Sequence, residues 1–135
     1  MIVVDVNVVA YLLIDGEHTA AAEAVLTADP EWAAPLLWRS EWRNFLAGYM
    51  RRGELDRAAA LERVEAAERL VQGREYLADS ARVMALVEAS TCAAYDCEYV
   101  ALAETLDVPL VTNDRRVLGD FPGRAVAPAT YVSAS

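Results

Sequence analysis

Short apolar runs alternate with longer amphipathic segments along this chain. Ile2–Val4 and Val108–Thr112 are compact apolar runs, and each lies just ahead of an acidic residue. Because neither run alternates apolar with polar positions, both are typical of parallel strands that are covered on both faces. We predict two further short strands, within Glu31–Pro35 and at Ala125–Ala127. The segment Glu75–Leu77 is compatible with either state.

Helical periodicity fills the segments between these runs. The clearest case is Leu36–Arg52, in which Trp38, Trp42, Phe45 and Tyr49 recur at helical spacing and form one apolar stripe. A second stripe, with Tyr95 and Tyr99, is expected in the helix 94–106. The other predicted helices are Val8–Ile14, Thr19–Ala28, Glu54–Val71, Ser80–Glu88 with Ser80 as its cap, and Arg115–Phe121.

This order of elements predicts a single α/β domain. Strands that alternate with helices favour a central, mainly parallel sheet. The length of 135 residues suits one domain with one core, spanning residues 1–135. The apolar fraction of 56% excludes intrinsic disorder, which needs few apolar groups.

The charge balance narrows the possible functions. Twenty-one acidic residues stand against twelve basic ones, which gives a net charge of −9, and all twelve bases are arginine. A diffuse attraction to nucleic acid is therefore excluded, and any contact with phosphates must be local. The absence of lysine excludes Schiff-base chemistry, phosphate-loop lysines, receiver domains and haloacid-type phosphatases.

Neither targeting signals nor cysteine chemistry indicates a specific function. The first basic residue is Arg39 and the early apolar run Val8–Ile14 is too short for a membrane span, so we expect a cytoplasmic protein with no membrane role. Cys92 and Cys97 are too few for a disulfide framework and are expected to be reduced, partly buried thiols. His18 stands alone in a polar stretch, which excludes a histidine-based triad.

Four acidic residues fall outside the obviously solvated faces. Asp5 and Asp114 each follow a predicted buried strand, at the sheet edge where parallel α/β folds bind ligands. Glu41 borders the apolar stripe of its helix. Asp96 lies in the first turn of its helix, a position that the helix dipole alone would favour.

Structural roles could account for each of these acids separately. Asp5 and Asp114 could cap the helices that follow them. Glu41 could pair with Arg39 or Arg43. If the four carboxylates meet, however, a cation is required, because two such charges about 4 Å apart repel by about 4 kcal/mol at an effective dielectric near 20. Oxygen ligands without histidine or cysteine favour Mg²⁺ or Mn²⁺.

Several short motifs together resemble the PIN-domain family, and most closely its VapC-type ribonuclease toxins. They are the opening Val4–Val8, the segment Ser40–Trp42, the helix Ala94–Glu104 and the run Leu110–Asp114. They occur in the family's order and extend to about Phe121. The helix followed by Thr-x-Asp is the most specific part, whereas each short motif alone is weak.

The resemblance implies a three-layer α/β/α sandwich with an acidic metal site. It implies Mg²⁺- or Mn²⁺-dependent hydrolysis of RNA, a homodimer, and inhibition by a cognate antitoxin. Residue by residue, it implies that the catalytic, metal-binding acids are Asp5, Glu41, Asp96 and Asp114, with Asn7 and Thr112 as polar supports. Asn7 departs from the small hydroxyl residue that is common in the family, and Cys97 replaces a small residue such as alanine.

We therefore expect an endoribonuclease toxin of a VapBC-type pair, in which a metal-activated water attacks the RNA phosphodiester. Glu41 would bind a second ion or orient the water. Arg115 and Arg116 are candidates for RNA contacts, or else solvated charges. A non-catalytic metal- or protein-binding module and a single-stranded DNA nuclease remain alternatives. The three tryptophans are expected mostly in the core, although one or two could anchor an antitoxin helix.

Overall fold

A five-stranded parallel sheet forms the centre of the computed structural model, which describes residues 1–134. The strand order is β3-β2-β1-β4-β5. Val3 lies opposite Ala33 of β2 on one side and opposite Leu110 of β4 on the other. The strands are β1 (Ile2–Val4), β2 (Trp32–Pro35), β3 (Glu75–Tyr76), β4 (Leu110–Val111) and β5 (Ala125–Val126).

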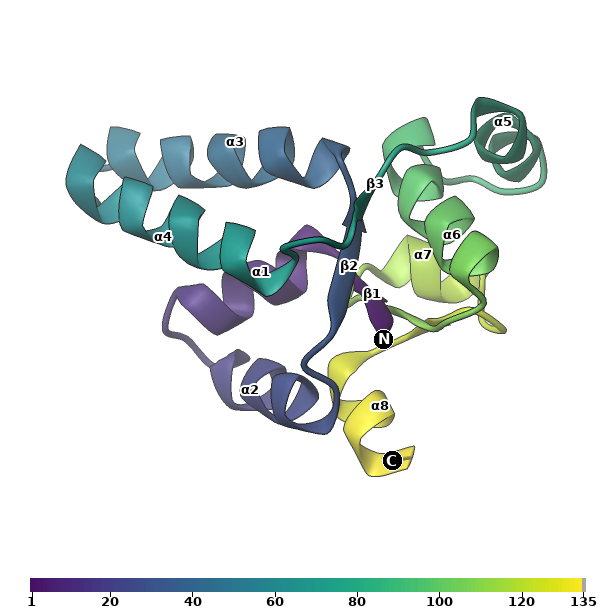
Figure 1. The fold of residues 1–135 in the computed structure, drawn as a ribbon, viewed down its shortest axis with the longest axis horizontal. Helices are drawn as coiled ribbons and strands as arrows, with labels where there is room; N and C mark the ends of the chain where they lie inside the picture. The colour runs from purple at the N-terminus through teal and green to yellow at the C-terminus, as the bar shows by residue number, and fades with distance from the viewer. Residues whose placement is uncertain (135) are drawn as a thin grey trace.

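Helices cover both faces of this sheet (Figure 1). The first layer holds α1 (Val6–Leu13), α2 (Thr19–Ala28), α3 (Leu37–Arg51) and α4 (Arg57–Leu70), with α8 (Pro128–Ala134) packed against α2. The opposite layer holds α5 (Ser80–Glu88) and α6 (Ala94–Leu106), and α7 (Arg115–Asp120) contacts β5. The expected three-layer α/β/α sandwich is confirmed.

Burial of the strands on both faces explains their lack of polar residues. All three residues of β1 are buried, and so are all four of β2. The expectation that the tryptophans lie in the core is also confirmed, because Trp32, Trp38 and Trp42 are at most 2% exposed. Their use as antitoxin anchors is therefore wrong.

Each buried indole N–H finds an acceptor, as burial of this ring requires. The Nε1 of Trp32 donates to the carbonyl of Asp29 at 2.8 Å, and that of Trp42 donates to the carbonyl of Arg63 at 3.1 Å. The Nε1 of Trp38 donates to the Glu75 carboxylate at 2.6 Å. These bonds tie the end of α2, α4 and β3 to the core.

Capping side chains move several helix starts from their predicted positions. Asp56 accepts a hydrogen bond from the N–H of Ala59, so α4 begins three residues later than Glu54. Asp79, not Ser80, caps α5 by accepting from the N–H of Arg82. The prediction of Ser80 as the cap is wrong because Ser80 is already helical.

Two further expectations need correction. The aromatic residues of α3 do not form one buried stripe, because Trp38 and Trp42 are buried whereas Phe45 is 38% exposed. On α6, Tyr99 is buried but Tyr95 is 63% exposed, so the two do not share one apolar face. Helix α8 was not predicted, and it begins at Pro128, a residue whose fixed φ suits a first helical position.

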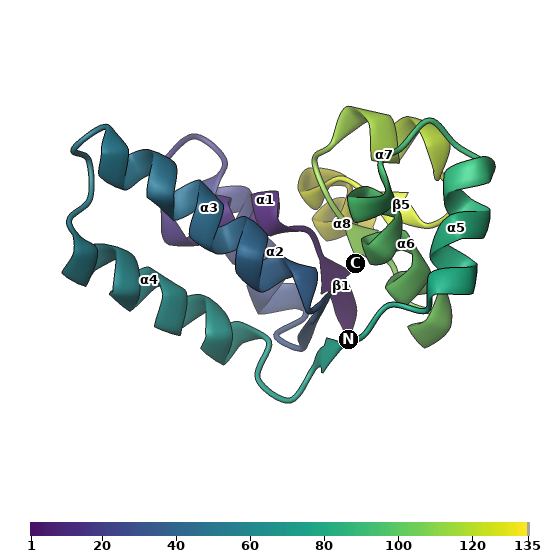
Figure 2. The same cartoon turned by 90° about the horizontal axis from the view of Figure 1, so that it is seen from above.

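The strand order changes direction at β1. The chain leaves β1 through α1 and α2 to reach β2 on one side, while β4 pairs with β1 on the other side. Figure 2 shows α3 and α4 to one side of β1 and α5 to α7 to the other. In open parallel sheets, this change of direction marks the ligand-binding edge. Among the helices within residues 1–134, none has the length and apolar character that a membrane span requires.

Candidate active site

Asp5 lies at the carboxyl end of β1 and is 8% exposed. Its backbone N–H donates to the carbonyl of Val111 in β4, which fixes it at the switch between the two strands. Asp5 occupies the N-cap position of α1, yet its side chain forms no capping hydrogen bond. The capping interpretation is therefore wrong for Asp5.

A hydroxyl group holds the Asp5 carboxylate in place. Thr112 is fully buried, and its Oγ1 donates to Oδ2 of Asp5 at 2.7 Å. The same Oγ1 accepts from the N–H of Asp114 at 3.1 Å and from Nδ2 of Asn7 at 3.4 Å. Of the two predicted polar supports, Thr112 therefore contacts Asp5 directly, and Asn7 is connected to Asp5 through Thr112.

Burial and neighbouring charge raise the pKa of Asp5 from 3.8 to about 6. Burial is the largest cause, and the charges of Asp96 and Asp114 raise the pKa further. The hydrogen bond from Thr112 opposes the shift because it favours the ionised form. Asp5 is therefore a carboxylate whose ionisation calls for a compensating positive charge.

Asp114 follows β4 and does cap a helix. Its Oδ1 accepts from the N–H groups of Arg116 at 2.9 Å and Val117 at 3.1 Å, so it caps the start of α7. For this residue the structural interpretation is confirmed. Since the two bonds share one oxygen, capping and a role at the sheet edge are compatible.

Asp96 lies in the first turn of α6 and is half-buried. Burial raises its pKa, and the charge of Asp114 adds to the rise. A hydrogen bond with the backbone of Ala93 and the nearby guanidinium of Arg116 lower it. Arg116 itself donates to the carbonyl of Thr91 at 3.2 Å, which directs its charge toward the start of α6.

Glu41 approaches from α3 and is partly buried. Its Oε1 accepts a hydrogen bond from the hydroxyl of Tyr99 at 2.7 Å. Burial raises the pKa of Glu41 and the charges of Asp5 and Asp96 raise it further, while the bond from Tyr99 lowers it. Glu41 is thus electrostatically connected with two of the other candidate acids.

The structural alternative in which Glu41 pairs with Arg39 is wrong. The guanidinium of Arg39 binds the carboxylate of Glu75 through Nε at 2.6 Å and Nη2 at 2.8 Å, and it also pairs with Glu68. Arg43 is exposed. Glu41 is therefore held by a phenol rather than neutralised by an arginine.

Tyr99 is the site residue that sequence reasoning missed. Its helical spacing indicates only an apolar face, but a buried phenol needs a hydrogen-bond partner. This requirement, together with the position of Tyr99 one turn after Asp96, is the sequence signal from which Tyr99 could have been predicted as a site residue. Burial of the ring, together with the charges of Asp5 and Glu41, holds the pKa of Tyr99 well above its ordinary value, so its hydroxyl remains a donor.

The thiols take no part in this arrangement. Cys97 is fully buried and lies against the hydroxyl of Ser90, as the packing interpretation expected. Burial raises the pKa of Cys92 to about 12, and the carboxylate of Asp120 adds to the rise. Both cysteines are free thiols.

The donor set fits a hard divalent cation. Within residues 1–134, no three carboxylate, thiol or imidazole side chains are close enough together to enclose a metal ion by themselves. Mg²⁺ keeps several waters and needs only one or two carboxylates, so this arrangement suits it. The candidate ligands are all oxygen donors, and their mutual repulsion favours a divalent charge.

Comparison with known proteins agrees with this class of fold. The PIN domain profile matches residues 2–122. The chain therefore belongs to the PIN domain family. Among curated protein sequences, none matches this chain significantly.

Solved structures with the same fold share little sequence with this chain. PAE2754 from Pyrobaculum aerophilum superposes with a TM-score of 0.77 at 22% identity, over 98% of this chain and 94% of that chain. FitAcB from Neisseria gonorrhoeae gives a TM-score of 0.76 at 20% identity, over 96% and 99%. A toxin–antitoxin complex from Klebsiella pneumoniae gives 0.68 at 20% identity, over 95% and 98%.

Proposed function

We propose that this protein is a metal-dependent endoribonuclease that hydrolyses RNA phosphodiester bonds. The main observation behind this proposal is that Asp5 lies buried where the strand order changes direction. Burial and the charges of Asp96 and Asp114 raise its pKa. Membership of the PIN domain family supports the same class of activity.

Asp5 is the central metal ligand in this proposal, and Asp96 and Asp114 complete the site directly or through water. The Thr112 hydroxyl, which is hydrogen-bonded to Asn7, holds the Asp5 carboxylate in a fixed position relative to the loop that leads to Asp114. Glu41, steadied by its own hydrogen bond, binds a second ion or orients the attacking water. A bound Mg²⁺ or Mn²⁺ supplies a nucleophile at neutral pH and stabilises charge on the phosphate.

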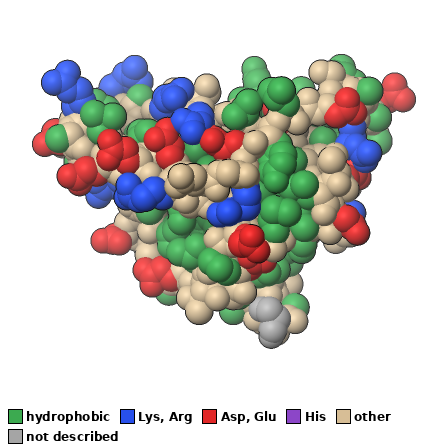
Figure 3. All heavy atoms as spheres, viewed as in Figure 1, with side chains coloured by type: hydrophobic (Ala, Val, Ile, Leu, Met, Phe, Trp, Pro, Cys, Tyr) green, Lys and Arg blue, Asp and Glu red, His purple; other side chains and the backbone are tan. Residues whose placement is uncertain are grey.

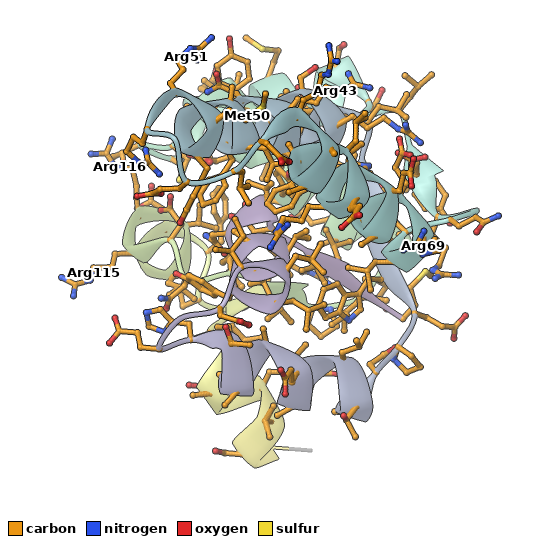
Figure 4. The ribbon with its side chains drawn as sticks, turned by 90° about the vertical axis from the view of Figure 1, so that its left-hand side faces the viewer. Arg43, Met50, Arg51, Arg69, Arg115 and Arg116 are labelled. Atoms are coloured by element: carbon orange, nitrogen blue, oxygen red, sulfur yellow. The ribbon has the colours of Figure 1, made fainter. Side chains whose placement is uncertain are left out.

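Arg115 and Arg116 are the proposed contacts to the RNA backbone. Both are exposed on α7, directly after Asp114. Figure 4 shows them projecting from one side of the molecule, the side on which Arg51 also projects from the end of α3. Three arginines on one side provide local attraction for phosphates that the net charge of −9 does not provide.

The biological role that we propose is the toxin of a VapBC-type pair, acting in the cytoplasm as a homodimer. Structural similarity to the toxin–antitoxin complex from Klebsiella pneumoniae supports a cognate antitoxin partner. The acidic surface suits an arginine-rich inhibitor, because opposite charges favour fast and selective association.

Incubation of the antitoxin-free protein with structured RNAs and Mg²⁺ or Mn²⁺ tests the proposal. We expect cleavage that chelation by EDTA abolishes and that Asp5→Ala and Asp5→Asn reduce at least a hundredfold. Full activity of either variant contradicts the site. Parallel single-stranded DNA assays and calorimetric Mn²⁺ titration identify the two alternatives: cleavage of DNA alone, or metal uptake without turnover, contradicts the ribonuclease.

A further inference from the structure

A ring-lined cavity opens beside the candidate active site, between α1, the loop that follows it and α3. Its volume is about 380 Å³, within the range of small-ligand pockets. Four aromatic or imidazole rings line it, from Tyr11, His18, Phe45 and Tyr49. The nuclease chemistry described above uses none of these rings.

The rings are arranged as a stacking surface rather than as closed core. The rings of Tyr11 and His18 lie 4.5 Å apart between centroids, and those of Phe45 and Tyr49 lie 5.4 Å apart. The Phe45 side chain is 38% exposed and the His18 side chain 46%. The Phe45 ring also stacks on the buried ring of Trp42, with centroids 5.7 Å apart. Aromatic rings that remain partly exposed beside a cavity are suited to a planar ligand.

Polar contacts connect this cavity to the acids. Asn7 lines the cavity, and its Nδ2 donates to the Thr112 hydroxyl that holds Asp5. From the opposite side, Nδ2 of Asn113 donates to the hydroxyl of Tyr11 at 3.1 Å. Hydrogen bonds through Asn7 and Asn113 therefore connect the cavity to the sheet edge where the scissile phosphate would bind.

The charges around the cavity select the part of a nucleotide that fits. Asp15 and Glu17 are exposed at its rim, and none of its described lining residues is an arginine. The guanidinium of Arg52 lies 4.5 Å from the centroid of the Tyr49 ring, but it is paired with the carboxylate of Glu54. Carboxylates repel phosphate but accept hydrogen bonds from the amino and imino groups of a base. The cavity thus suits a neutral, unpaired base rather than a phosphate.

We infer that this cavity is a nucleobase subsite that stacks one unstacked base of the RNA next to the cleaved phosphodiester. This inference rests on the proposed ribonuclease function and adds to it a requirement for an unpaired base. Phe45 provides the main stacking surface because it is the most accessible apolar ring, and Asp15 and Glu17 favour bases that carry hydrogen-bond donors.

Binding of a fluorescein-labelled single-stranded 12-mer RNA to the Asp5→Asn protein tests the subsite without turnover. An abasic ribose is scanned along the RNA. We expect an abasic ribose to weaken binding at one position only, next to the bond that the wild-type protein cleaves. The loss should be at least about fivefold, which corresponds to the lower end of the free energy of base stacking on an aromatic ring. In the Asp5→Asn background, Phe45→Ala and Phe45→Leu should weaken binding of the intact RNA equally and leave binding of that abasic RNA unchanged. Phe45→Tyr should restore binding.

Controls separate stacking from other effects. Met84→Ala removes an exposed apolar side chain on α5, in the opposite layer, and should not change binding. Circular dichroism and light scattering show whether each variant stays folded and keeps its oligomeric state. If the Phe45 variants change the oligomeric state, or weaken binding of intact and abasic RNA alike, the subsite is refuted.

A second readout identifies the ring directly. RNA that carries 5-iodouridine at the sensitive position should photocrosslink to Phe45, Tyr49, Tyr11 or His18, and crosslinks confined to other residues overturn the inference. The two proposals fail differently. Coupling between Phe45 and one abasic position without RNA cleavage by the wild-type protein refutes the ribonuclease and leaves only a base-stacking site, whereas cleavage without coupling refutes the subsite alone.

Discussion

Glu41 depends on a single phenol for its orientation. The Tyr99 hydroxyl is buried with the ring and donates to Oε1 of Glu41 at 2.7 Å, which lowers the pKa of a carboxylate that burial and neighbouring charges raise. We predict that Tyr99→Phe raises the pKa of Glu41 further and lowers the free energy of unfolding by about 1 kcal/mol, the value of a typical internal hydrogen bond. NMR titration of the Glu41 carboxyl carbon and urea denaturation measure the two effects.

Tyr95→Phe is the matched control for this prediction. Tyr95 is on the same helix but is 63% exposed, so loss of its hydroxyl should change neither the stability nor the Glu41 pKa. Equal effects of the two substitutions would show that the hydrogen bond does not set the ionisation of Glu41.

The candidate acids were accessible to sequence reasoning because two of them follow buried strands. Asp5 and Asp114 are placed by strand ends, which a run of apolar residues makes visible. The partner of Glu41 could not be predicted from the sequence, because residues 41 and 99 are brought together by the packing of two helices from opposite sides of β1. Sequence spacing carries no information on such a contact.

At the scale of elements, Asp114 combines a structural and a proposed chemical role that substitutions can separate. Asp114→Asn keeps an oxygen that can accept from the N–H groups of Arg116 and Val117, so α7 should keep its cap and the stability should stay within about 0.5 kcal/mol. Asp114→Ala removes the cap and should cost about 1 kcal/mol. Both should abolish RNA cleavage, as measured by an RNA assay alongside thermal unfolding.

If Asp114→Asn cleaves RNA like the wild-type protein, Asp114 is only a helix cap. Asp79 gives the matched comparison, because it caps α5 away from the candidate site. Asp79→Ala should lower stability by a similar amount and leave cleavage unchanged.

Glu75 connects three elements. It accepts from Nε1 of Trp38 and from two nitrogens of Arg39, which also binds Glu68 of α4, and these bonds lower its pKa. We predict that Glu75→Gln lowers the free energy of unfolding by about 2 kcal/mol, because it weakens charge-assisted hydrogen bonds at a mostly buried position. Chemical denaturation checks this, and the exposed Glu88→Gln should have no effect. A neutral Glu75→Gln would mean that the packing of β3 does not need this charge.

Most elements were predicted close to their observed limits, including the three-residue strand β1 (Ile2–Val4). The predicted limits of Thr19–Ala28 and Ala94–Leu106 match α2 and α6. In contrast, the sequence does not decide the state of β3, because a two-residue strand contains no period. Its existence depends on the register with β2, where Ala34 lies opposite Glu75.

At the scale of the whole molecule, the net charge of −9 has two components. Among the seventeen acids outside the candidate site, Asp56 caps a helix, and Glu68 and Glu75 pair with an arginine. Figure 3 shows acidic and basic side chains interspersed over α3 and α4, where neighbouring charges offset one another. The four candidate acids are different, because burial and mutual repulsion raise the pKa of three of them: Asp5, Glu41 and Asp96.

This concentration of charge predicts how stability depends on pH in the absence of divalent ions. The pKa of Asp5 is about 6 in the folded protein against 3.8 ordinarily, so the folded state binds the proton more tightly than the unfolded chain. Its contribution to stability is therefore complete below about pH 4 and is lost as the pH rises through 6. A shift of this size corresponds to about 3 kcal/mol, and the raised pKa values of Glu41 and Asp96 act in the same direction.

We therefore predict that the protein in EDTA unfolds at lower urea concentration at pH 7.5 than at pH 5, and that Asp5→Asn removes most of this difference. Glu75 and Asp120, whose pKa values are lowered, act in the opposite sense but only below about pH 4.5, outside this interval. Mg²⁺ at millimolar concentration should stabilise the wild-type protein more at pH 7.5 than at pH 5, since ligation requires the ionised carboxylates. Equal stabilisation of Asp5→Asn by Mg²⁺ at pH 7.5 would place the cation elsewhere, because the buried charge that calls for it is that of Asp5.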